Sequence, residues 1–371
     1  MRPEQLLESV RNLLAQRALA EPYTPLVLMV SGGSDSTALA YVAAELVAAD
    51  EVGPLAMLHV NHCLRGDDSN GDARFVADLA HVLDIPLFTC EIDIARLVCE
   101  ERGNMEAIAR RERYAAAYEA LQSHCAYWRF PLETGRIAVA HTADDRIENF
   151  YMRSIVGTGP GGFRSMRYEN GQVIRPLLDV ERADLRAFIE ARAEAGAPVA
   201  RDGQGALWRE DATNADTDHL RNYVRHAIVP AAREKNPRLT ETLVRTMNLI
   251  ADEDDLLQAV AEREVDELVS WIEPDEARLG DFSAGCVLAS RIAFEDVAIY
   301  RRVCFAVLGL MLGDDARVEA ASVEAVLAAC DGGRLQSGYV ANIQGDLAVS
   351  ANKRGVRIEP MAAFRARRKR K

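Results

Sequence analysis

Short apolar runs alternate with longer segments of helical period from residue 26 onward. Strands are expected in the apolar runs at 26–30, 55–60, 87–92 and 137–140, and helices in the segments at about 36–48, 70–83, 104–124 and 143–155. This alternation predicts an α/β fold, a doubly wound parallel sheet with helices on both faces. Open sheets of this kind bind ligands at the carboxyl ends of their strands, so the loops there are the first candidates for a functional site.

The pattern changes after about residue 230. A long acidic helical signal covers about 236–270, a second helical segment lies at about 293–312, and short alternating runs close the chain. A chain of 371 residues is long enough for two or three domains. We therefore predict an α/β domain over residues 1–230 and an α-rich domain with a small β element over residues 231–371.

The composition is that of a globular protein, with 49% hydrophobic and 27% charged residues. No apolar run reaches the roughly 18 residues that span a bilayer, and the N-terminal segment mixes charges into a helical pattern unlike a signal peptide. We predict a cytoplasmic protein without a membrane partner. The seven cysteines are scattered and form no CxxC pair, which argues against disulfides, a zinc site and a paired-cysteine redox site.

The net charge of −13 repels nucleic acid on average, so an RNA partner would have to meet local basic clusters. Three such clusters stand out: Arg110, Arg111 and Arg113; Arg301 and Arg302; and the terminal run Arg365 to Lys371, in which only Ala366 is uncharged. The terminal run is open to two interpretations, a solvated mobile end or a contact surface for phosphate.

The strongest local signal is SGGSDST at residues 31–37, which follows an apolar strand and precedes a helix. Gly32 and Gly33 let the backbone approach an anion, and the helix start adds free amides and the positive end of the helix dipole. The loop lacks the lysine of the P-loop that transfers a γ-phosphate. The alternative is a serine–glycine turn in which Asp35 caps the helix without binding a ligand.

A second candidate group lies just beyond the fourth predicted strand, in AHTADDRIENF at residues 140–150. If a helix starts at Asp144, Asp145 and Glu148 lie three residues apart on one face of it, where they could hold a magnesium ion or an amine. His141 precedes them at the strand end. Carboxylates at a helix start also stabilise the helix dipole without any catalytic role, and the spacing alone does not separate the two interpretations.

Arg110 and Arg113 are three residues apart, so they share one face of the helix expected at 104–124. Their planar, permanently charged guanidinium groups suit phosphate, whether on a nucleotide or on RNA. The structural alternative is a solvated helix in which Glu106 and Glu112 balance the arginines.

Arg221 and Arg225 form a second pair with helical spacing, four residues apart. Both could face RNA or a nucleotide from the same side of a helix. The alternative is a structural ion pair with Asp218.

These segments, taken in order, resemble the PP-loop ATP pyrophosphatases and, among them, the tRNA(Ile)-lysidine synthetase family. The blocks that carry the resemblance are SGGSDS (31–36), HVNHCLR (59–65), EAIARRERY (106–114), AHTADDRIENFYMRSIVGTGPGGF (140–163), IRPLLDVERADL (174–185) and WREDATNADTDHLRNYVRHAIVP (208–230). The resemblance covers about residues 26–230. The chain departs from the family at Cys63, Thr142, Asn149 and Val156, which replace a glycine, a histidine, a threonine and an arginine.

The resemblance implies roles for particular residues. The ATP-binding residues would be Ser31, Gly32, Gly33, Ser34, Asp35 and Ser36, with Asp35 also positioning the magnesium ion of Mg-ATP. The catalytic residues would be Asp35, Arg110, Arg113, His141, Asp145 and Glu148. Contacts to tRNA or substrate would come from Arg153, Arg221 and Arg225.

The implied reaction is a ligation in two steps. The C2 oxygen of the wobble cytidine in a CAU anticodon attacks the α-phosphate of ATP, and the ε-amine of free lysine then displaces AMP. The implied partners are tRNA(Ile) and lysine, with ATP and Mg²⁺ as cofactors. The C-terminal region would be an accessory tRNA-binding domain, and a homodimer is a further hypothesis.

Two alternatives stay open at this point. The first is a tRNA thiolase of the same superfamily, although the paired cysteines common in thiolases are missing from this sequence. The second is a non-catalytic, nucleotide-sensing RNA-binding protein built on the same loop.

Overall fold

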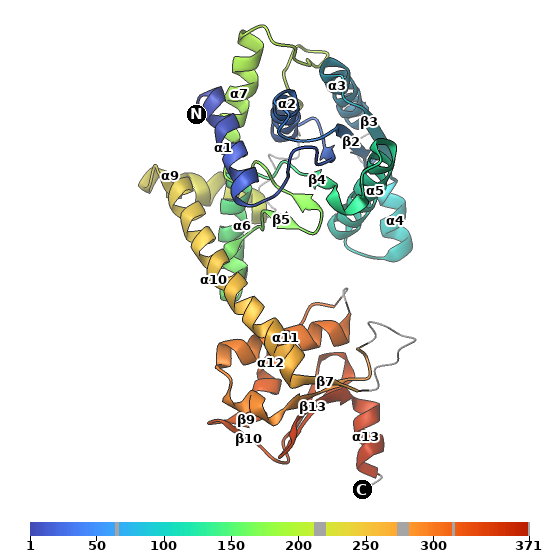
Figure 1. The fold of residues 1–371 in the computed structure, drawn as a ribbon, viewed down its shortest axis with the longest axis vertical. Coiled ribbons are helices and arrows are strands. Elements are labelled where there is room, and N and C mark those ends of the chain that lie inside the picture. The colour runs from blue at the N-terminus through green and yellow to red at the C-terminus, as the bar shows by residue number, and fades with distance from the viewer. Residues whose placement is uncertain (64–66, 211–219, 273–281, 314–315, 370–371) are drawn as a thin grey trace. The chain divides into compact units, whose positions relative to one another are not determined.

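The chain forms two compact units, and the division between them falls within one long helix. The computed structural model describes residues 1–63, 67–210, 220–272, 282–313 and 316–369. Unit 1 is Met1–Ile250 and unit 2 is Ala251–Lys371, so the division lies in helix α10 (Leu239–Leu268), later than the boundary predicted near residue 230 (Figure 1). No helix among the described residues is long and apolar enough to cross a membrane.

Unit 1 is built on a six-stranded sheet in the order β3-β2-β1-β4-β6-β5. Its strands are β1 (Leu26–Met29), β2 (Leu55–Asn61), β3 (Leu87–Glu91), β4 (Arg136–Ala138), β5 (Glu169–Asn170) and β6 (Val173–Ile174). Strands β3, β2, β1, β4 and β6 run parallel, and β5 pairs antiparallel with β6 at the edge. The doubly wound parallel sheet that the sequence predicts is confirmed.

Helices cover both faces of this sheet (Figure 1). They are α1 (Pro3–Gln16), α2 (Ser34–Ala48), α3 (Asp67–Leu83), α4 (Ile94–Glu101), α5 (Met105–Trp128), α6 (Ala143–Val156), α7 (Arg182–Glu194), α8 (Leu220–Tyr223), a π-helical turn (Val224–Ile228), α9 (Val229–Lys235) and the first part of α10. The four helices expected between the strands are α2, α3, α5 and α6. Helix α4 was not predicted, because its 8 residues are too few to show a helical period.

The strands alternate their side chains between two cores. Leu26 and Leu28 of β1 pack with α1, α2, α3 and α7 on one face, whereas Val27 packs with α5 on the other. All three side chains are at most 3% exposed. Burying a side chain of this size contributes about 1.5–3 kcal/mol, so burial on both faces holds β1 firmly. The rigid end of β1 is the point from which the glycine–serine loop emerges.

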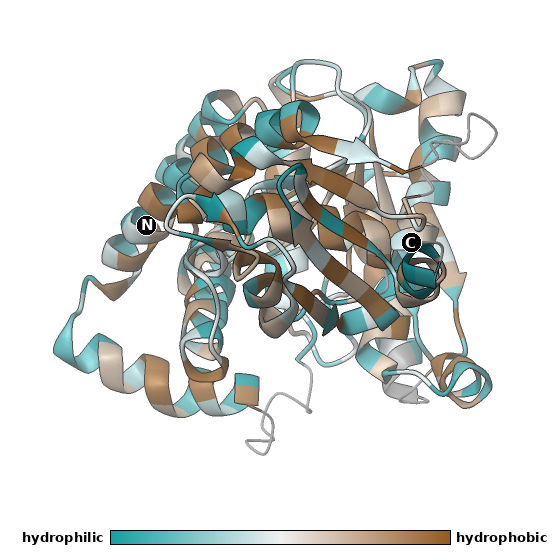
Figure 2. Ribbon diagram, turned by 90° about the horizontal axis from the view of Figure 1, so that it is seen from below, coloured by the Kyte–Doolittle hydropathy of each residue, from teal (hydrophilic) through white to brown (hydrophobic). Residues whose placement is uncertain are grey.

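Unit 2 contains a five-stranded antiparallel sheet in the order β11-β12-β13-β8-β7 and a β9–β10 pair. The strands are β7 (Val269–Trp271), β8 (Cys286–Ala289), β9 (Cys330–Asp331), β10 (Arg334–Leu335), β11 (Val340–Ile343), β12 (Leu347–Asn352) and β13 (Gly355–Pro360). The helices are the second part of α10, α11 (Val297–Leu312), α12 (Ala320–Leu327) and α13 (Met361–Lys369). Apolar and polar positions alternate along strands (Figure 2), and the apolar ones join α10, α11 and α12 in a separate core.

The described part of the basic C-terminal run belongs to helix α13, which covers residues 361–369. Met361 and Phe364 are buried against the sheet. Arg367 donates from Nε to Glu359 of β13 at 3.0 Å, and this carboxylate is only 2% exposed. A buried apolar face and an ion pair therefore anchor the helix. The side chains of Arg365, Arg368 and Lys369 are exposed on this helix, so a solvated surface and a contact with phosphate both stay open for the terminal run.

Candidate active site

The glycine–serine loop joins the end of β1 to α2 (Ser34–Ala48). Gly32 has a φ of +92°, a left-handed conformation that a side chain would strain. Ser36 Oγ accepts from the Ser31 amide at 3.2 Å and donates to the Gly33 carbonyl at 3.1 Å, so the loop closes onto the start of the helix. Free amides and the helix dipole at the start of α2 favour an anion at this point.

Asp35, in the first turn of α2, links the loop to helix α7. Its Oδ2 accepts from Nε of Arg182 at 2.8 Å, and its Oδ1 accepts from the Ser34 hydroxyl at 3.0 Å. Burial raises the pKa of Asp35, and the Arg182 guanidinium offsets only part of this effect. Arg182 is the first residue of α7 and was not among the predicted site residues.

Helix α6 carries the two predicted carboxylates. Thr142 caps this helix: its amide and its hydroxyl both donate to Asp145 Oδ2, at 2.9 and 3.0 Å. Asp145 is 6% exposed and Glu148 is 2% exposed. Burial alone would raise the pKa of Asp145, but the guanidinium groups of Arg182 and Arg221 outweigh it and hold the pKa below its usual value. Asp145 therefore stays ionised.

Three arginines converge on this carboxylate pair. Arg221 donates to Asp145 at 2.8 Å and to Glu148 at 3.0 Å. Arg225 donates twice to Glu148, at 2.6 and 3.1 Å, and Arg182 reaches Asp145 at 3.4 Å. Because Arg182 also holds Asp35, a single guanidinium joins the loop to the carboxylate pair.

An unusual helical turn brings Arg221 and Arg225 to the same carboxylate. Helix α8 runs into the π-helical turn at Val224–Ile228 and then into α9. Arg221 thus pairs with the carboxylates of α6, and Asp218, its alternative partner, lies outside the described residues.

A cavity of about 1090 Å³ opens at the carboxyl ends of β1, β2 and β4. Small-ligand pockets usually measure about 300–1,000 Å³, so this one can hold a nucleotide. Its walls come from the loop, the end of β2, the end of β4, α5 and α7. Arg182 and Arg225 line the cavity, and Asp145 and Glu148 lie buried behind these two arginines.

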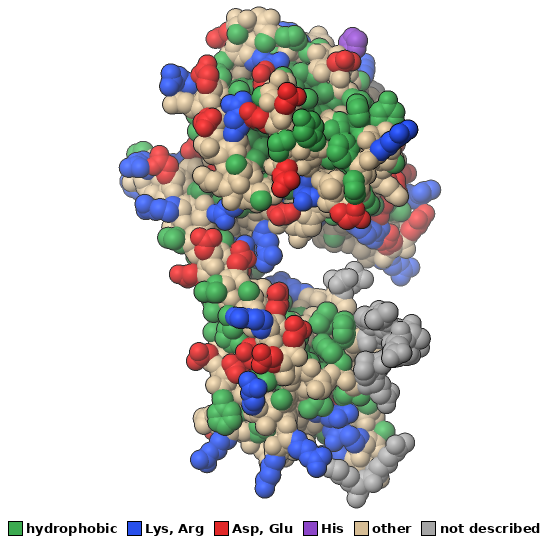
Figure 3. Space-filling view, in the orientation of Figure 1, with side chains coloured by type: hydrophobic (Ala, Val, Ile, Leu, Met, Phe, Trp, Pro, Cys, Tyr) green, Lys and Arg blue, Asp and Glu red, His purple; other side chains and the backbone are tan. Residues whose placement is uncertain are grey.

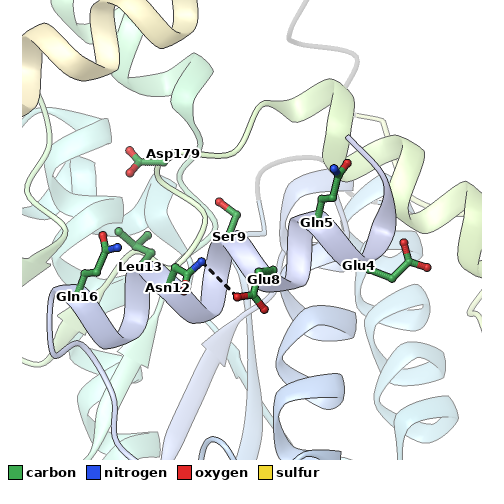
Figure 4. A pocket seen from close by; sticks show the side chains of 8 residues that line it. All are labelled: Glu4, Gln5, Glu8, Ser9, Asn12, Leu13, Gln16 and Asp179. Carbon is green, nitrogen blue, oxygen red and sulfur yellow. Dashed lines mark hydrogen bonds between the residues drawn. The ribbon is translucent and has the colours of Figure 1, made fainter.

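A second hollow, of about 650 Å³, lies along α1 (Figure 4). Its lining residues are Glu4, Gln5, Glu8, Ser9, Asn12, Leu13, Gln16 and Asp179. All of them except Asp179 belong to one helix, so the hollow lacks the opposing walls that enclose a small ligand. The candidate site is therefore the cavity at the edge of the sheet.

The α5 wall of the cavity carries positive charge without a matching carboxylate. Arg110 and Arg113 both line the cavity, and in the described parts of the chain neither forms an ion pair. Arg110 stacks over Tyr114, 4.9 Å from the ring centroid, while Arg111 turns outward to surface glutamates. The cavity arginines with carboxylate partners are Arg182, Arg186, Arg209 and Arg225. An anionic ligand would supply the negative charge that Arg110 and Arg113 lack as a partner.

His141, just beyond β4, lines the cavity in a neutral form. Burial lowers its pKa from 6.5 to about 4, although Asp145 opposes part of the shift. Its buried Nδ1 has no hydrogen-bond partner among the described residues. His141 therefore suits a neutral hydrogen-bonding role toward a ligand better than the role of a charged acid.

The end of β2 forms another part of the wall. His59 is buried, with its Nδ1 2.9 Å from the Val30 carbonyl oxygen, and His62 lines the cavity beyond the strand. Cys63 has a φ of +55°, and its amide donates to Asn61 Oδ1 at 2.9 Å. This is the left-handed conformation that glycine adopts most easily, so the chain keeps a glycine-like backbone at the position where it carries cysteine.

The structure brings most of the predicted site residues together around the cavity, but Arg153 is an exception. It lies at the exposed end of α6 and donates to Asn149 at 2.9 Å. The prediction missed Arg182 and also Arg175, which is 7% exposed and lies near Arg110. Arg175 and Arg182 both belong to the block IRPLLDVERADL (174–185), whose resemblance to the family could have pointed to them.

A parallel sheet with a glycine–serine loop after its first strand, facing a carboxylate helix, defines a class of nucleotide-binding domain. The PP-loop domain family matches residues 4–232, which is more than half of the chain. The chain belongs to the PP-loop family.

Within this family the chain is similar to tRNA(Ile)-lysidine synthases. It is 31% identical to that of Geobacter sulfurreducens over 327 residues, covering 87% of this chain and 63% of the relative. It is 35% identical to that of Symbiobacterium thermophilum over 277 residues (73% of this chain, 53% of the relative). It is 36% identical to that of Thermus thermophilus over 244 residues (65% and 42%). The chain thus spans about half the length of these relatives.

One solved structure shares the fold. The U34-tRNA thiolase NcsA from Methanococcus maripaludis matches with a TM-score of 0.50 at 15% identity, covering 67% of this chain and 79% of that chain. At this identity the likeness concerns the fold alone.

Proposed function

We propose that the chain joins free lysine to C2 of the wobble cytidine of tRNA(Ile) with a CAU anticodon, consuming ATP and releasing AMP and pyrophosphate. The observation that carries the proposal is Arg182, whose guanidinium holds Asp35 of the loop at 2.8 Å and Asp145 of the carboxylate pair at 3.4 Å. Pyrophosphate release and amine transfer can therefore take place in one cavity. The names of the relatives at 31–36% identity point to the same reaction.

ATP and Mg²⁺ fit the residues present. The amides at the start of α2, with Ser31, Ser34 and Ser36, suit the β- and γ-phosphates. The carboxylates of Asp35 and Asp145 are the oxygen donors that Mg²⁺ prefers, and both belong to the Arg182 network. Bound Mg²⁺ would neutralise charge on the phosphates.

The first step forms a bond from the cytidine C2 oxygen to the α-phosphorus and breaks the bond to pyrophosphate. The protein stabilises the negative charge of the transition state chiefly by electrostatics. Arg110 and Arg113 lack carboxylate partners among the described residues and face the cavity, so they are free to contact the α-phosphate or an RNA phosphate. Arg182 and Arg225 can transfer from carboxylate to phosphate in the same step.

The second step forms a bond from the lysine ε-nitrogen to C2 and releases AMP. The amine must be neutral when it attacks. Asp145, with its lowered pKa, is a weak proton acceptor, so its part is to orient the amine and the arginines. Glu148, which is 2% exposed behind Arg225, is the carboxylate that we assign to accept the proton once the arginine moves to phosphate.

The tRNA would also contact unit 2, in keeping with an accessory role for residues 231–371 beside a catalytic domain over 1–230. The chain is acidic overall, but Lys353, Arg354, Arg365, Arg368 and Lys369 fall on α13 and on the turn between β12 and β13. Lys and Arg side chains gather at the lower end of unit 2 (Figure 3). A helix anchored on the sheet presents these charges in a fixed arrangement, which suits an RNA backbone.

The proposal is tested by incubating the pure protein with labelled lysine, ATP and tRNA that carries a CAU anticodon. Label in the RNA, one AMP per lysine, and a lysine adduct by mass spectrometry of the nucleoside are expected. A sulfur-containing nucleoside, formed in a parallel incubation with sulfide as the sulfur donor in place of lysine, would establish the thiolase alternative. ATP binding without AMP release would establish the non-catalytic alternative. The homodimer and the cytoplasmic location stay predictions.

A further inference from the structure

Arg146 is the largest fully buried side chain of the described residues and is 1% exposed. It stands between Asp145 and Glu148 on α6, but it points to a different side of the helix, away from the cavity. A buried guanidinium is costly unless charge and hydrogen bonds compensate it. Its contacts are therefore a strong constraint on helix α6.

The Arg146 guanidinium joins helix α6 to three other segments of unit 1, which contribute Tyr168, Asp179 and Asn248. Arg146 donates from Nη1 to the Tyr168 hydroxyl at 3.0 Å and to Asp179 Oδ1 at 2.8 Å, and from Nη2 to Asn248 Oδ1 at 2.9 Å. The Tyr168 hydroxyl lies 2.8 Å from Asp179 Oδ2 and 2.9 Å from Asn248 Oδ1. The Arg146 carbonyl also accepts from the Ser165 hydroxyl at 2.9 Å.

This polar network sets the rotation of α6 about its axis. Successive residues of an α-helix are about 100° apart, so fixing Arg146 also fixes the directions of Asp145 and Glu148. A rotation or shift of α6 would break several charge-assisted hydrogen bonds together, and such bonds are stronger than those between neutral groups. Apolar packing of Ile147 alone would permit more freedom, because such contacts are not directional.

Helix α10 enters the network through Asn248. A second link lies nearby, where Arg233 donates to Asp144 of α6 at 3.0 Å and to Thr240 of α10 at 3.3 Å. The same helix continues into unit 2, where Asp254 pairs with Arg302 at 2.7 Å. The helix that holds the carboxylates in place is thus continuous with the unit that carries the basic surface.

We propose that Arg146 and Asn248 are positioning residues for the ligation, through which α10 holds the carboxylates of α6 in register with the loop. This inference rests on the proposed function. It predicts that the contact between Asn248 and Arg146 governs the rate of chemistry and leaves substrate affinity largely unchanged.

Asn248→Leu tests the proposal, because it removes the acceptor for Arg146 while keeping the size of the side chain. A misplacement of about 1 Å can cost a hundredfold in rate, so kcat at saturating substrates is expected to fall roughly 10- to 100-fold. The KM values for tRNA, ATP and lysine should stay within about twofold. Leu249→Ala, at the neighbouring position that is 60% exposed, is the matched control and should leave both parameters unchanged.

Asn248→Asp separates positioning from stability. The aspartate keeps an oxygen acceptor for Arg146 but adds a charge beside Asp179, so Tm is expected to fall while kcat stays near that of the wild type. A normal kcat in Asn248→Leu, or equal losses of kcat in the Leu and Asp variants, would overturn the proposal.

Amide hydrogen exchange in α6 (residues 143–156), measured without substrates, distinguishes failure of this inference from failure of the proposed function. Faster exchange in Asn248→Leu, with normal exchange in Asn248→Asp, is expected even if the wild-type protein incorporates no lysine. Unchanged exchange in the Leu variant would count against the network regardless of the reaction.

Discussion

Each unit buries a glutamate among arginines, and the two glutamates differ in what surrounds them. Glu148 in unit 1 and Glu359 in unit 2 are both 2% exposed. Glu148 accepts from Arg221 at 3.0 Å and from Arg225 at 2.6 Å. Glu359 accepts from Nε of Arg357 and from Nε of Arg367, both at 3.0 Å. Burial and pairing alone therefore do not distinguish the two groups.

The difference lies in where the partners come from and what they face. The two arginines that donate to Glu148, Arg221 and Arg225, are 73 and 77 residues away in sequence and also pair with Asp145, and Arg225 lines the cavity. The arginines of Glu359 are 2 and 8 residues away, and the pairing fastens α13 to the sheet. In this protein, the ion pairs of Glu148 join distant segments beside the candidate site, whereas those of Glu359 join nearby segments and fasten a helix to a sheet.

The largest effect is expected at Asp35. This residue of the glycine–serine loop is joined through Arg182 to the helix that carries Glu148. Asp35→Ala should lower AMP formation on the order of a thousandfold, because it removes a charged group that aligns phosphate and arginine. Binding of tRNA should persist. AMP release from labelled ATP, with electrophoretic measurement of tRNA binding, checks both points. Wild-type AMP release in this variant would contradict the assignment.

Glu148→Gln and Glu359→Gln test the comparison directly. Both variants should lower Tm, because each leaves arginines with a weaker partner, at a cost of about 1–3 kcal/mol. Only Glu148→Gln should also lower kcat, roughly a hundredfold, since it removes the proposed proton acceptor. Thermal unfolding and single-turnover lysine incorporation, measured well below Tm, separate the two effects. A catalytic loss in the Glu359 variant would erase the distinction between site and anchor.

A moderate effect is expected from the basic surface of α13, the helix that the ion pair between Glu359 and Arg367 fastens to the sheet. Replacing Arg365, Arg368 and Lys369 together with glutamine should raise the KM for tRNA about tenfold and leave kcat unchanged at saturating tRNA. The slope of log KM against log salt should shrink by about 0.7–0.9 for each phosphate contact that is lost.

The matched control replaces the exposed residues Arg291, Arg317 and Arg334 of unit 2 with glutamine, so the change in net charge is the same. If the control raises KM equally, the effect belongs to overall charge and not to the α13 surface.

The smallest effect is a pH dependence of stability in unit 1. The folded-state pKa of His141 is about 4, below its ordinary value of 6.5, so the unfolded chain binds the proton more readily. The contribution of His141 to stability is complete above about pH 6.5 and is lost as the pH falls toward 4. His141→Asn should therefore flatten the decrease in Tm between pH 7 and 5. An unchanged decrease would show that other groups cause it.

The sequence predicted the core of unit 1 well because its signals are local. Strand-length apolar runs, helical periods and the placement of SGGSDST between a strand and a helix each depend on neighbouring residues. The shared face of Asp145 and Glu148 follows from helix geometry alone. Helix α4 escaped prediction because it is short, and α13 because its basic composition masks the two apolar residues, Met361 and Phe364, that dock it.

The residues that the sequence could not identify act across long distances. In the sequence, Arg182 resembles an ordinary charged residue at a helix start. In the structure it donates to Asp35 and to Asp145, which lie 147 and 37 positions earlier in the chain. Arg146 has the pattern of a surface position in an amphipathic helix, yet its partners include Asn248, 102 positions later. Contacts between residues so far apart leave no periodic pattern in the sequence.

The sequence by itself determined the sheet, the loop and the carboxylate helix, because backbone preferences and hydrophobic periodicity are encoded by near neighbours. The tertiary structure alone decided which arginines share the carboxylates, which buried ion pair faces a cavity, and which helix fixes the rotation of α6. The physical reason is that the strength of a charged contact depends on burial and on the direction of partners from distant segments, and these exist only once the chain has folded.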